Sequence, residues 1–182
     1  SGNGSTGIQD KYMVSEIEKL RKDKDIKAVV FRVNSGGGSA YASEQIWKAI
    51  GDLKEEKPVV VSMGDLAASG GYYISANADR IVAQATTMTG SIGIFGLIPN
   101  FEGTTEKIGI HSDVVKTNEF ADFGNLTRPF NEREKEAMQN YVEKGYDLFL
   151  TRCAEGRNMD KDTLALYAEG RVWTGNQAKE IG

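Results

Sequence analysis

One short stretch, residues 63–73 (MGDLAASGGYY), constrains the fold of this chain more than any other. The residues before it are apolar and typical of a strand, and the residues after it are compatible with a helix. Between them lies one hydroxyl, that of Ser69, followed directly by Gly70 and Gly71. At a helix N-terminus, free backbone N–H groups and the positive end of the dipole stabilise a developing anion. Ser69 is therefore a candidate nucleophile, and the alternative is a helix cap in an ordinary turn.

Apolar periodicity predicts that strands and helices alternate along the rest of the chain. Strands are expected at residues 26–33, 58–62, 80–83, 91–94, 113–116 and 171–173. Helices are expected around residues 13–20 and 46–53 and at residues 72–78, 101–108, 131–155, 164–168 and 176–181, with a loop at 117–130. In the long helix, the expected buried residues are Met138, Tyr141, Tyr146, Phe149 and Leu150, and residues 132–135 are expected to form a solvated face. This alternation favours an α/β fold with a mostly parallel sheet.

Composition excludes several classes of partner and cofactor. The chain has 22 Lys and Arg against 26 Asp and Glu, a formal net charge of −4 without a basic run, so no nucleic-acid partner is expected. The single histidine, His111, and the single cysteine, Cys153, offer no metal-ligand set, and no cofactor is expected. Neither residue has a spacing that favours a Ser-His pair or a reactive thiol. No apolar run reaches the roughly 20 residues that span a bilayer.

Two glycine-rich turns follow two successive predicted strands. Residues 34–39 (NSGGGS) end the first strand, and Gly37 and Ser69 are 32 residues apart. In a right-handed βαβ unit both turns lie at the carboxyl edge of the sheet. The first turn could present backbone N–H groups to a carbonyl oxygen while the second presents the hydroxyl, which is a geometry for acyl transfer. Phosphate binding by residues 34–39 is disfavoured because the glycine spacing of phosphate-binding loops is absent.

Taken together, these segments resemble the signal peptide peptidase A family, also called protease IV, which shares its fold with the Clp protease and the crotonases. The matching segments follow one another over most of the chain: residues 33–39 (VNSGGGS), 61–64 (VSMG), 67–75 (AASGGYYIS), 89–96 (TGSIGIFG) and 170–175 (GRVWTG). The family has proline where this chain has Gly36, a departure that should loosen the turn without removing its N–H donors. The resemblance implies a Clp protease/crotonase-like α/β fold, with a mostly parallel sheet and flanking helices.

The resemblance also implies roles for individual residues. Ser69 would be the nucleophile, the backbone N–H groups of Gly37 and Gly70 would form the oxyanion hole, and the Ser91 hydroxyl would orient the catalytic base. In this family the base is a lysine, which must be uncharged to accept the serine proton, and burial lowers its pKa toward that state. In short members of the family this lysine lies roughly fifty residues after the nucleophile, and Ala121, 52 residues after Ser69, occupies that position here.

Two hypotheses explain the missing base. The favoured one is that residues 1–182 are a single peptidase domain from the C-terminal half of a longer, two-repeat parent protein, whose N-terminal repeat supplies the lysine. The sequences of residues 89–96 and 171–175 are closer to the second half of this long form. The expected start and closing segment of the family domain are also missing, which suggests a fragment. The alternative is a short member in which the lysine has been replaced by Ala121.

The resulting hypothesis is a serine endopeptidase of the Ser-Lys dyad type that degrades released signal peptides and other extended, apolar peptides. The family resemblance implies homo-oligomers anchored to the bacterial inner membrane by a segment outside this chain, with the catalytic domain on the extracytoplasmic (periplasmic) side. Two alternatives stay open at this point. One is a crotonase-like acyl-CoA hydratase or isomerase, which needs pocket carboxylates and no serine nucleophile. The other is a catalytically inactive peptide-binding domain.

Overall fold

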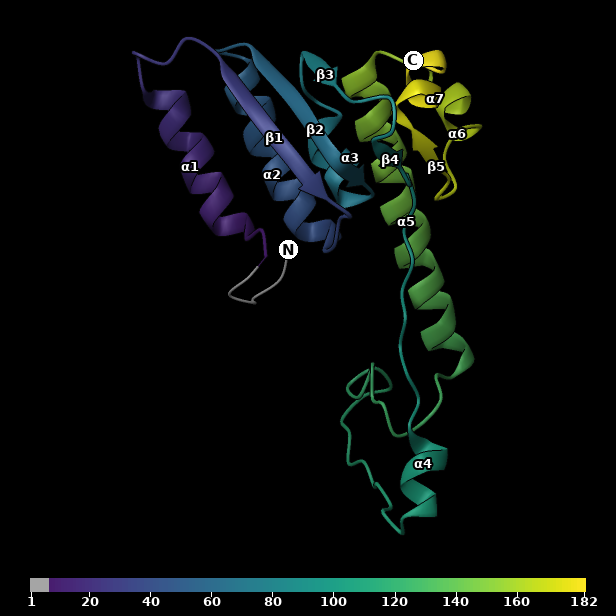
Figure 1. Cartoon of the computed structure of the whole chain (residues 1–182). Coiled ribbons are helices and arrows are strands. Elements are labelled where there is room, and N and C mark those ends of the chain that lie inside the picture. Colours follow the sequence, from purple (N-terminus) through teal and green to yellow (C-terminus); the bar gives the residue numbers. More distant parts are fainter. Residues whose placement is uncertain (1–6) are drawn as a thin grey trace. The chain divides into compact units, whose positions relative to one another are not determined.

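The structure, a computed structural model, describes residues 7–182 and divides into two compact units (Figure 1). Unit 1 is formed by the chain up to Ile94 together with Tyr146–Gly182, and unit 2 is formed by Phe95–Gly145. The long helix α5 (Glu132–Arg157) contributes residues to both units.

Unit 1 contains a five-stranded sheet that is mostly parallel. Its strands are β1 (Val29–Ser35), β2 (Val59–Ala68), β3 (Arg80–Val82), β4 (Met88–Gly90) and β5 (Val172–Thr174). Strand β2 pairs in parallel with β1 on one edge and with β3 and β4 on the other, and β4 pairs with β5 in antiparallel orientation. The predicted α/β class with a mostly parallel sheet is therefore confirmed.

The helices of unit 1 bury apolar faces in two core clusters. Besides α5, these helices are α1 (Asp10–Lys22), α2 (Ala40–Lys54), α3 (Gly70–Ser75), α6 (Lys161–Ala165) and α7 (Gly175–Glu180). In the first cluster, Ile17 of α1 and Ile46 of α2 pack with Val61 of β2. Each isoleucine lies on the apolar face that the helical spacing within residues 13–20 or 46–53 predicted. The second cluster gathers residues of α2, α3, α5 and α6 around Phe149, which is fully buried.

The strand expected at residues 91–94 is wrong, because the strand that pairs with β2 is β4, immediately before it. Two threonines explain the difference. The Thr89 hydroxyl donates to the Ala67 carbonyl oxygen (2.8 Å), and the Thr87 hydroxyl donates to the Gly64 carbonyl oxygen (2.8 Å). A buried threonine whose hydroxyl is hydrogen-bonded in this way packs like an apolar β-branched residue. A strand prediction based on apolar residues alone does not count it.

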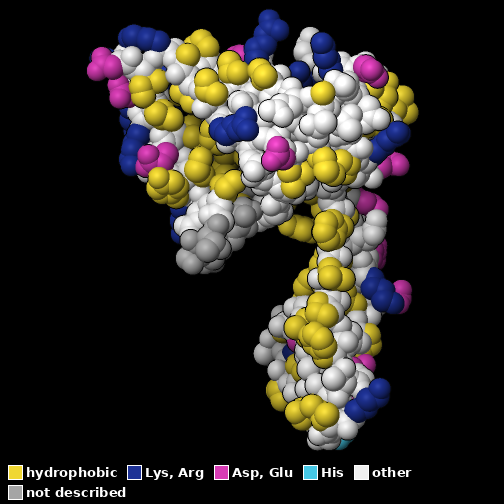
Figure 2. Space-filling view, in the orientation of Figure 1, with side chains coloured by type: hydrophobic (Ala, Val, Ile, Leu, Met, Phe, Trp, Pro, Cys, Tyr) yellow, Lys and Arg dark blue, Asp and Glu magenta, His cyan; other side chains and the backbone are white. Residues whose placement is uncertain are grey.

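Unit 2 contains α4 (Glu102–Lys107), the first part of α5 and a long loop. The strand expected at residues 113–116 is wrong, since these residues have no regular secondary structure. Tyr141, expected to be buried in α5, is 68% exposed. The loop predicted at residues 117–130 is confirmed as a series of turns. Unit 2 also exposes large apolar side chains (Figure 2), among them Phe95 (89%) and Leu97 (86%).

Candidate functional site

Ser69 lies between β2 and the six-residue helix α3, at the N-cap position, with φ 51° and ψ −123°. Its side chain makes no capping hydrogen bond, so the alternative role as a helix cap has no support in this geometry. A non-glycine residue in this backbone region costs of order 1–3 kcal/mol and persists only where its surroundings impose the conformation. Here the Ser69 N–H donates to the Gly90 carbonyl oxygen (2.9 Å), and the Ser69 carbonyl oxygen accepts from the Tyr73 N–H (2.8 Å).

The turn at Gly37 is in direct contact with the Ser69 turn. Gly37 has φ +94°, and a Cβ added to it would lie 2.5 Å from the Gly70 nitrogen and 2.8 Å from the Ser69 Cβ. The Gly37 N–H donates to the Ser35 hydroxyl (3.1 Å), whereas the Gly70 N–H is the first of α3 and has no acceptor within that helix. The structure thus brings together Gly37, Ser69 and Gly70, which the sequence analysis had grouped.

Ser91 is joined to this pair of turns through the residue before it. It follows Gly90, whose carbonyl oxygen accepts from the Ser69 N–H, and it also has a positive φ of 51°. The Ser91 N–H donates to the Arg171 carbonyl oxygen (2.7 Å), and the neighbouring Gly170 N–H donates to the Ile92 carbonyl oxygen (2.8 Å). The segment at residues 170–175 therefore holds the backbone of Ser91 in place.

Asn34 contributes to the site in a way that the sequence analysis missed. The register between β1 and β2 shifts after Val33, and Ser35 pairs with Ala67. The Asn34 side-chain oxygen accepts from the Leu66 N–H at this shift (3.2 Å), and a Cβ on Gly64 would lie 2.7 Å from that oxygen. Asn34 therefore stabilises the irregularity that leads β2 into Ser69. The only sequence signal was an amide residue next to a glycine-rich turn.

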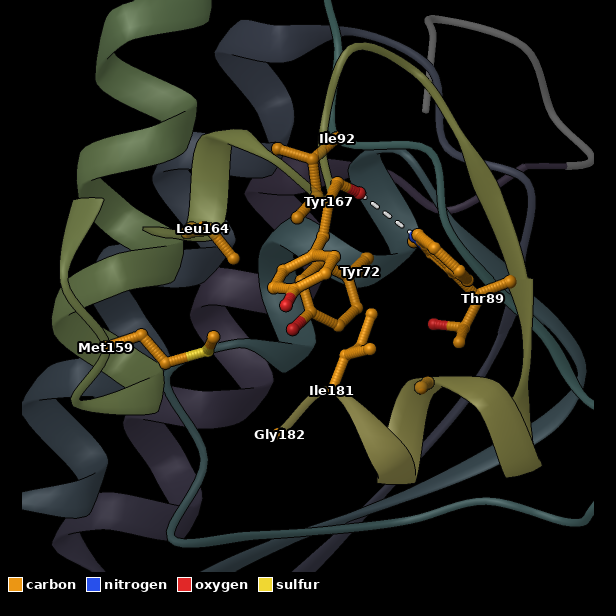
Figure 3. Close-up of a pocket in the computed structure, with 11 residues that line it drawn as sticks. Tyr72, Thr89, Ile92, Met159, Leu164, Tyr167, Ile181 and Gly182 are labelled. Atoms are coloured by element: carbon orange, nitrogen blue, oxygen red, sulfur yellow. Dashed lines mark hydrogen bonds between the residues drawn. The ribbon is translucent and has the colours of Figure 1, made fainter. Parts of the chain in front are cut away.

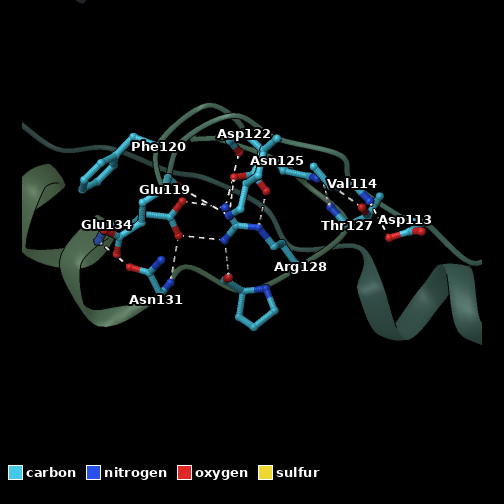
Figure 4. Close-up of polar contacts among 12 residues, drawn as sticks. Asp113, Val114, Glu119, Phe120, Asp122, Asn125, Thr127, Arg128, Asn131 and Glu134 are labelled. Atoms are coloured by element: carbon cyan, nitrogen blue, oxygen red, sulfur yellow. Dashed lines mark hydrogen bonds and ion pairs between the residues drawn. The ribbon is translucent and has the colours of Figure 1, made fainter.

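Ala121 lies in the loop of unit 2, where an ion-pair cluster organises the backbone (Figure 4). Arg128 donates to both carboxylate oxygens of Glu134 (2.6 and 2.7 Å) and to Asp122 (2.7 Å). The Glu134 side chain is fully buried, so the prediction that it belongs to a solvated face is wrong. The hydrogen bond from Arg128 lowers the pKa of Glu134 to about 2. Ala121 itself is exposed and carries no group that could accept a proton.

Three further titratable residues, Lys57, Cys153 and His111, show no feature of a catalytic base or nucleophile. The buried Lys57 donates to the Leu20 carbonyl oxygen (2.5 Å) and the Asp23 carbonyl oxygen at the end of α1. Burial raises the pKa of the Cys153 thiol, which disfavours its reactive thiolate form. His111 is exposed in unit 2. Among residues 7–182, no cluster of three or more His, Cys, Asp or Glu side chains could hold a metal ion.

A mainly apolar pocket lies beside β4 and β5 (Figure 3). Its lining includes Tyr72, Thr89, Ile92, Leu164, Tyr167 and Trp173. The polar groups of two of these residues are engaged within the protein: the Trp173 Nε1–H donates to the Tyr167 carbonyl oxygen (2.9 Å), and the Thr89 hydroxyl donates to β2. The pocket therefore supports the packing behind Gly90 and Ser91 and brings no catalytic group to the site.

Known proteins resemble this chain in sequence and in fold. The family model for peptidase family S49 matches residues 51–182. Protease 4 of Haemophilus influenzae is 45% identical over 91% of this chain, and a protein of Enterococcus faecium that carries the name signal peptide peptidase SppA is 38% identical over 93%. The chain spans only 27% of the first relative and 49% of the second.

The solved structure of a ClpP1 mutant from Listeria monocytogenes superposes on this chain with a TM-score of 0.61 at 16% identity, covering 95% of this chain and 80% of that one. This similarity confirms the predicted Clp protease type of fold, while the sequence matches confirm the predicted family. The family favours a serine peptidase over the acyl-CoA hydratase alternative. Since the match to the family model extends through the Ser69 turn to residue 182, the chain belongs to peptidase family S49.

Proposed function

We propose that Ser69 is the nucleophile of a serine endopeptidase. One observation carries the proposal: Ser69 is held at a positive φ at the start of α3, makes no capping bond, and contacts the Gly37 turn. Strained backbone of this kind is concentrated at functional sites. The N–H groups of Gly37 and Gly70 are the proposed oxyanion hole. During the reaction, a substrate oxygen would take the place of the Ser35 hydroxyl as acceptor for Gly37.

In the proposed mechanism, Ser69 Oγ attacks the peptide carbonyl carbon while a base takes the hydroxyl proton. The two N–H groups stabilise the oxyanion that forms. The C–N bond then breaks, the leaving amine takes the proton from the base, and an ester remains on Ser69. Water, deprotonated by the same base, attacks this ester. The bond between the acyl carbon and Ser69 Oγ then breaks, Ser69 Oγ takes the proton back from the base, and the acid product leaves. Ser91, held beside Ser69 through Gly90, is the proposed partner that orients the base.

The proposed base is a lysine from an N-terminal repeat of the longer parent protein. One observation supports this over a replaced lysine at Ala121, and a second disfavours a base elsewhere among the described residues. The identity to the Haemophilus influenzae relative, of which the chain spans 27%, is higher than that to the Enterococcus faecium relative, of which it spans 49%. The one lysine buried among the described residues, Lys57, is engaged with carbonyl oxygens of α1 and the residue after it. Residues 1–182 would then be the serine-bearing repeat.

The proposed substrates are released signal peptides and other extended apolar peptides, bound along the sheet edge by main-chain hydrogen bonds. The exposed apolar side chains of unit 2 support contacts with further subunits or with the N-terminal repeat, since large apolar surfaces mark interaction sites. The proposed location is the periplasmic face of the bacterial inner membrane, with the anchor outside this chain. No helix within residues 7–182 is long and apolar enough to cross a membrane.

The test is peptide hydrolysis and fluorophosphonate labelling of the full-length parent protein, wild type against Ser69→Ala. Loss of both activities, by at least about 10³-fold, is expected. Ser62→Ala is the matched control, because it makes the same change on β2 at a hydroxyl that accepts from Arg32 (2.8 Å). Equal rates in wild type and Ser69→Ala would exclude the peptidase mechanism. Peptide binding without turnover in the wild type would instead support the inactive binding domain.

A further inference from the structure

The two proposed oxyanion donors lie where two different helices begin. Helix α2 begins at Ala40, just after the Gly37 turn, and Ser39 caps it by accepting from the Ala42 N–H (3.3 Å). Helix α3 begins at Gly70 itself. The distance between the two donors therefore depends on how α2 and α3 are held together.

Helix α3 cannot hold this position by its own hydrogen bonds. It has six residues, which is far below the length at which isolated helices are stable, and it starts from the strained Ser69. It also packs closely on α2: a Cβ added to Gly70 would lie 2.5 Å from the Ser43 hydroxyl oxygen. Contacts from outside the helix must fix its position and its rotation.

Three side chains make such contacts, and we call them the helix junction: Glu44, Tyr73 and Arg152. Glu44 follows Ser43 on α2, Tyr73 lies one turn after Gly70 on α3, and Arg152 lies on α5. The Tyr73 hydroxyl donates to Glu44 Oε2, and Arg152 of α5 donates to Glu44 Oε1 (2.8 Å). The Arg152 guanidinium also lies 4.1 Å from the ring centroid of Trp47, on α2. The helix junction thus ties α2, α3 and the unit 1 part of α5 to one another (Figure 1).

Tyr73 connects the helix junction directly to the nucleophile. Its N–H donates to the Ser69 carbonyl oxygen (2.8 Å), and its ring packs on Phe149 with centroids 4.6 Å apart. Burial, followed by the hydrogen bond to Glu44, raises the pKa of Tyr73, so its hydroxyl keeps the proton that it donates. Loss of the Tyr73–Glu44 hydrogen bond would remove a contact that fixes the rotation of α3, and with it the position of Ser69 and the Gly70 N–H.

We propose that Glu44, Tyr73 and Arg152 are positioning residues that set the separation of the Gly37 and Gly70 N–H groups. This proposal rests on the proposed peptidase mechanism. Because the oxyanion forms during the reaction and is absent from the bound substrate, loosening the helix junction lowers kcat and leaves KM nearly unchanged. If these residues only stabilised the fold, substituting them would lower the melting temperature without lowering kcat selectively over KM.

The test uses the full-length parent protein at a temperature at which every variant is folded. Tyr73→Phe keeps the ring on Phe149 and removes only the donated hydrogen bond. It should lower kcat about tenfold, change KM by less than about twofold, and weaken inhibition by a peptide aldehyde, which mimics the oxyanion, about tenfold. Glu44→Gln retains an acceptor for Tyr73 and should lose less activity than Glu44→Ala. The control is Asp52→Asn, which breaks the exposed Lys48–Asp52 ion pair on the same helix and should leave kcat unchanged.

The outcomes separate the positioning role from the mechanism on which it rests. If hydrolysis by the wild type depends on Ser69 while Tyr73→Phe and Glu44→Ala keep the wild-type kcat, the positioning role is overturned and the peptidase mechanism stands. Equal loss of kcat in Glu44→Ala and Asp52→Asn would also overturn it. If wild-type hydrolysis does not depend on Ser69, both proposals are overturned.

Discussion

At the scale of single residues, Gly37 is a position where the site has no room for a side chain. Its φ of +94° disfavours any L residue, and an added Cβ would press on the Gly70 nitrogen at 2.5 Å. Gly37→Ala is expected to lower fluorophosphonate labelling of the parent protein by about 10²-fold or more, as the loss of an oxyanion donor does. The free energy of unfolding should fall by about 1–2 kcal/mol from the backbone strain alone.

Gly109→Ala separates these two effects. Gly109 has a similar φ of +74°, but nothing lies within 4 Å of an added Cβ. This variant should lose similar stability and label at the wild-type rate. Wild-type labelling of Gly37→Ala would contradict the close approach of the two turns.

At the scale of elements, the N-terminal end of α5 depends on a buried carboxylate. Glu134 accepts from Arg128 and from the Asn131 N–H (2.9 Å), and these bonds lower its pKa from 4.5 to about 2. A carboxyl group whose pKa is lower in the folded state stabilises fully above its unfolded pKa and loses this contribution as the pH falls. Glu134→Gln should therefore destabilise the chain at pH 7, and the difference from wild type should shrink between about pH 4.5 and pH 2.

Thermal unfolding of both proteins across this pH range measures the effect. Glu132→Gln is the matched control, because Glu132 is a nearby, highly exposed residue paired with Lys135. Such exposed pairs contribute little to stability. A Glu134→Gln effect that is the same at pH 7 and pH 2 would show that the buried charge is not its cause.

At the scale of the whole molecule, the proposed mechanism requires a base, which we propose comes from an N-terminal repeat outside this chain. The 182-residue chain alone is expected to hydrolyse peptides at least about 10³-fold more slowly than the parent protein. Adding the N-terminal repeat, in the same polypeptide or as a separate chain, should restore cleavage that Ser69→Ala abolishes. Turnover by the isolated chain at the parental rate would place the base within this sequence and contradict the two-repeat arrangement.

The sequence by itself determined the features that depend on neighbouring residues. The apolar spacing within residues 13–20 and within residues 46–53 predicted two amphipathic helices, which bury Ile17 and Ile46. The apolar run before Gly36 predicted β1. Small residues between a strand and a helix predicted the Ser69 turn, and two successive parallel strands predicted that this turn meets the Gly37 turn. These signals are local, or follow from one handedness rule, and therefore survive without knowledge of the fold.

Only the tertiary structure decided the features that depend on partners far apart in the chain. Glu44 meets Tyr73 across 29 residues and Arg152 across 108, and no local pattern encodes such a pairing. Thr87 and Thr89 are buried because β2 carbonyl oxygens accept hydrogen bonds from their hydroxyl groups. In each case a polar side chain is satisfied by a group far away in the chain, and the sheet order and helix packing decide which group that is.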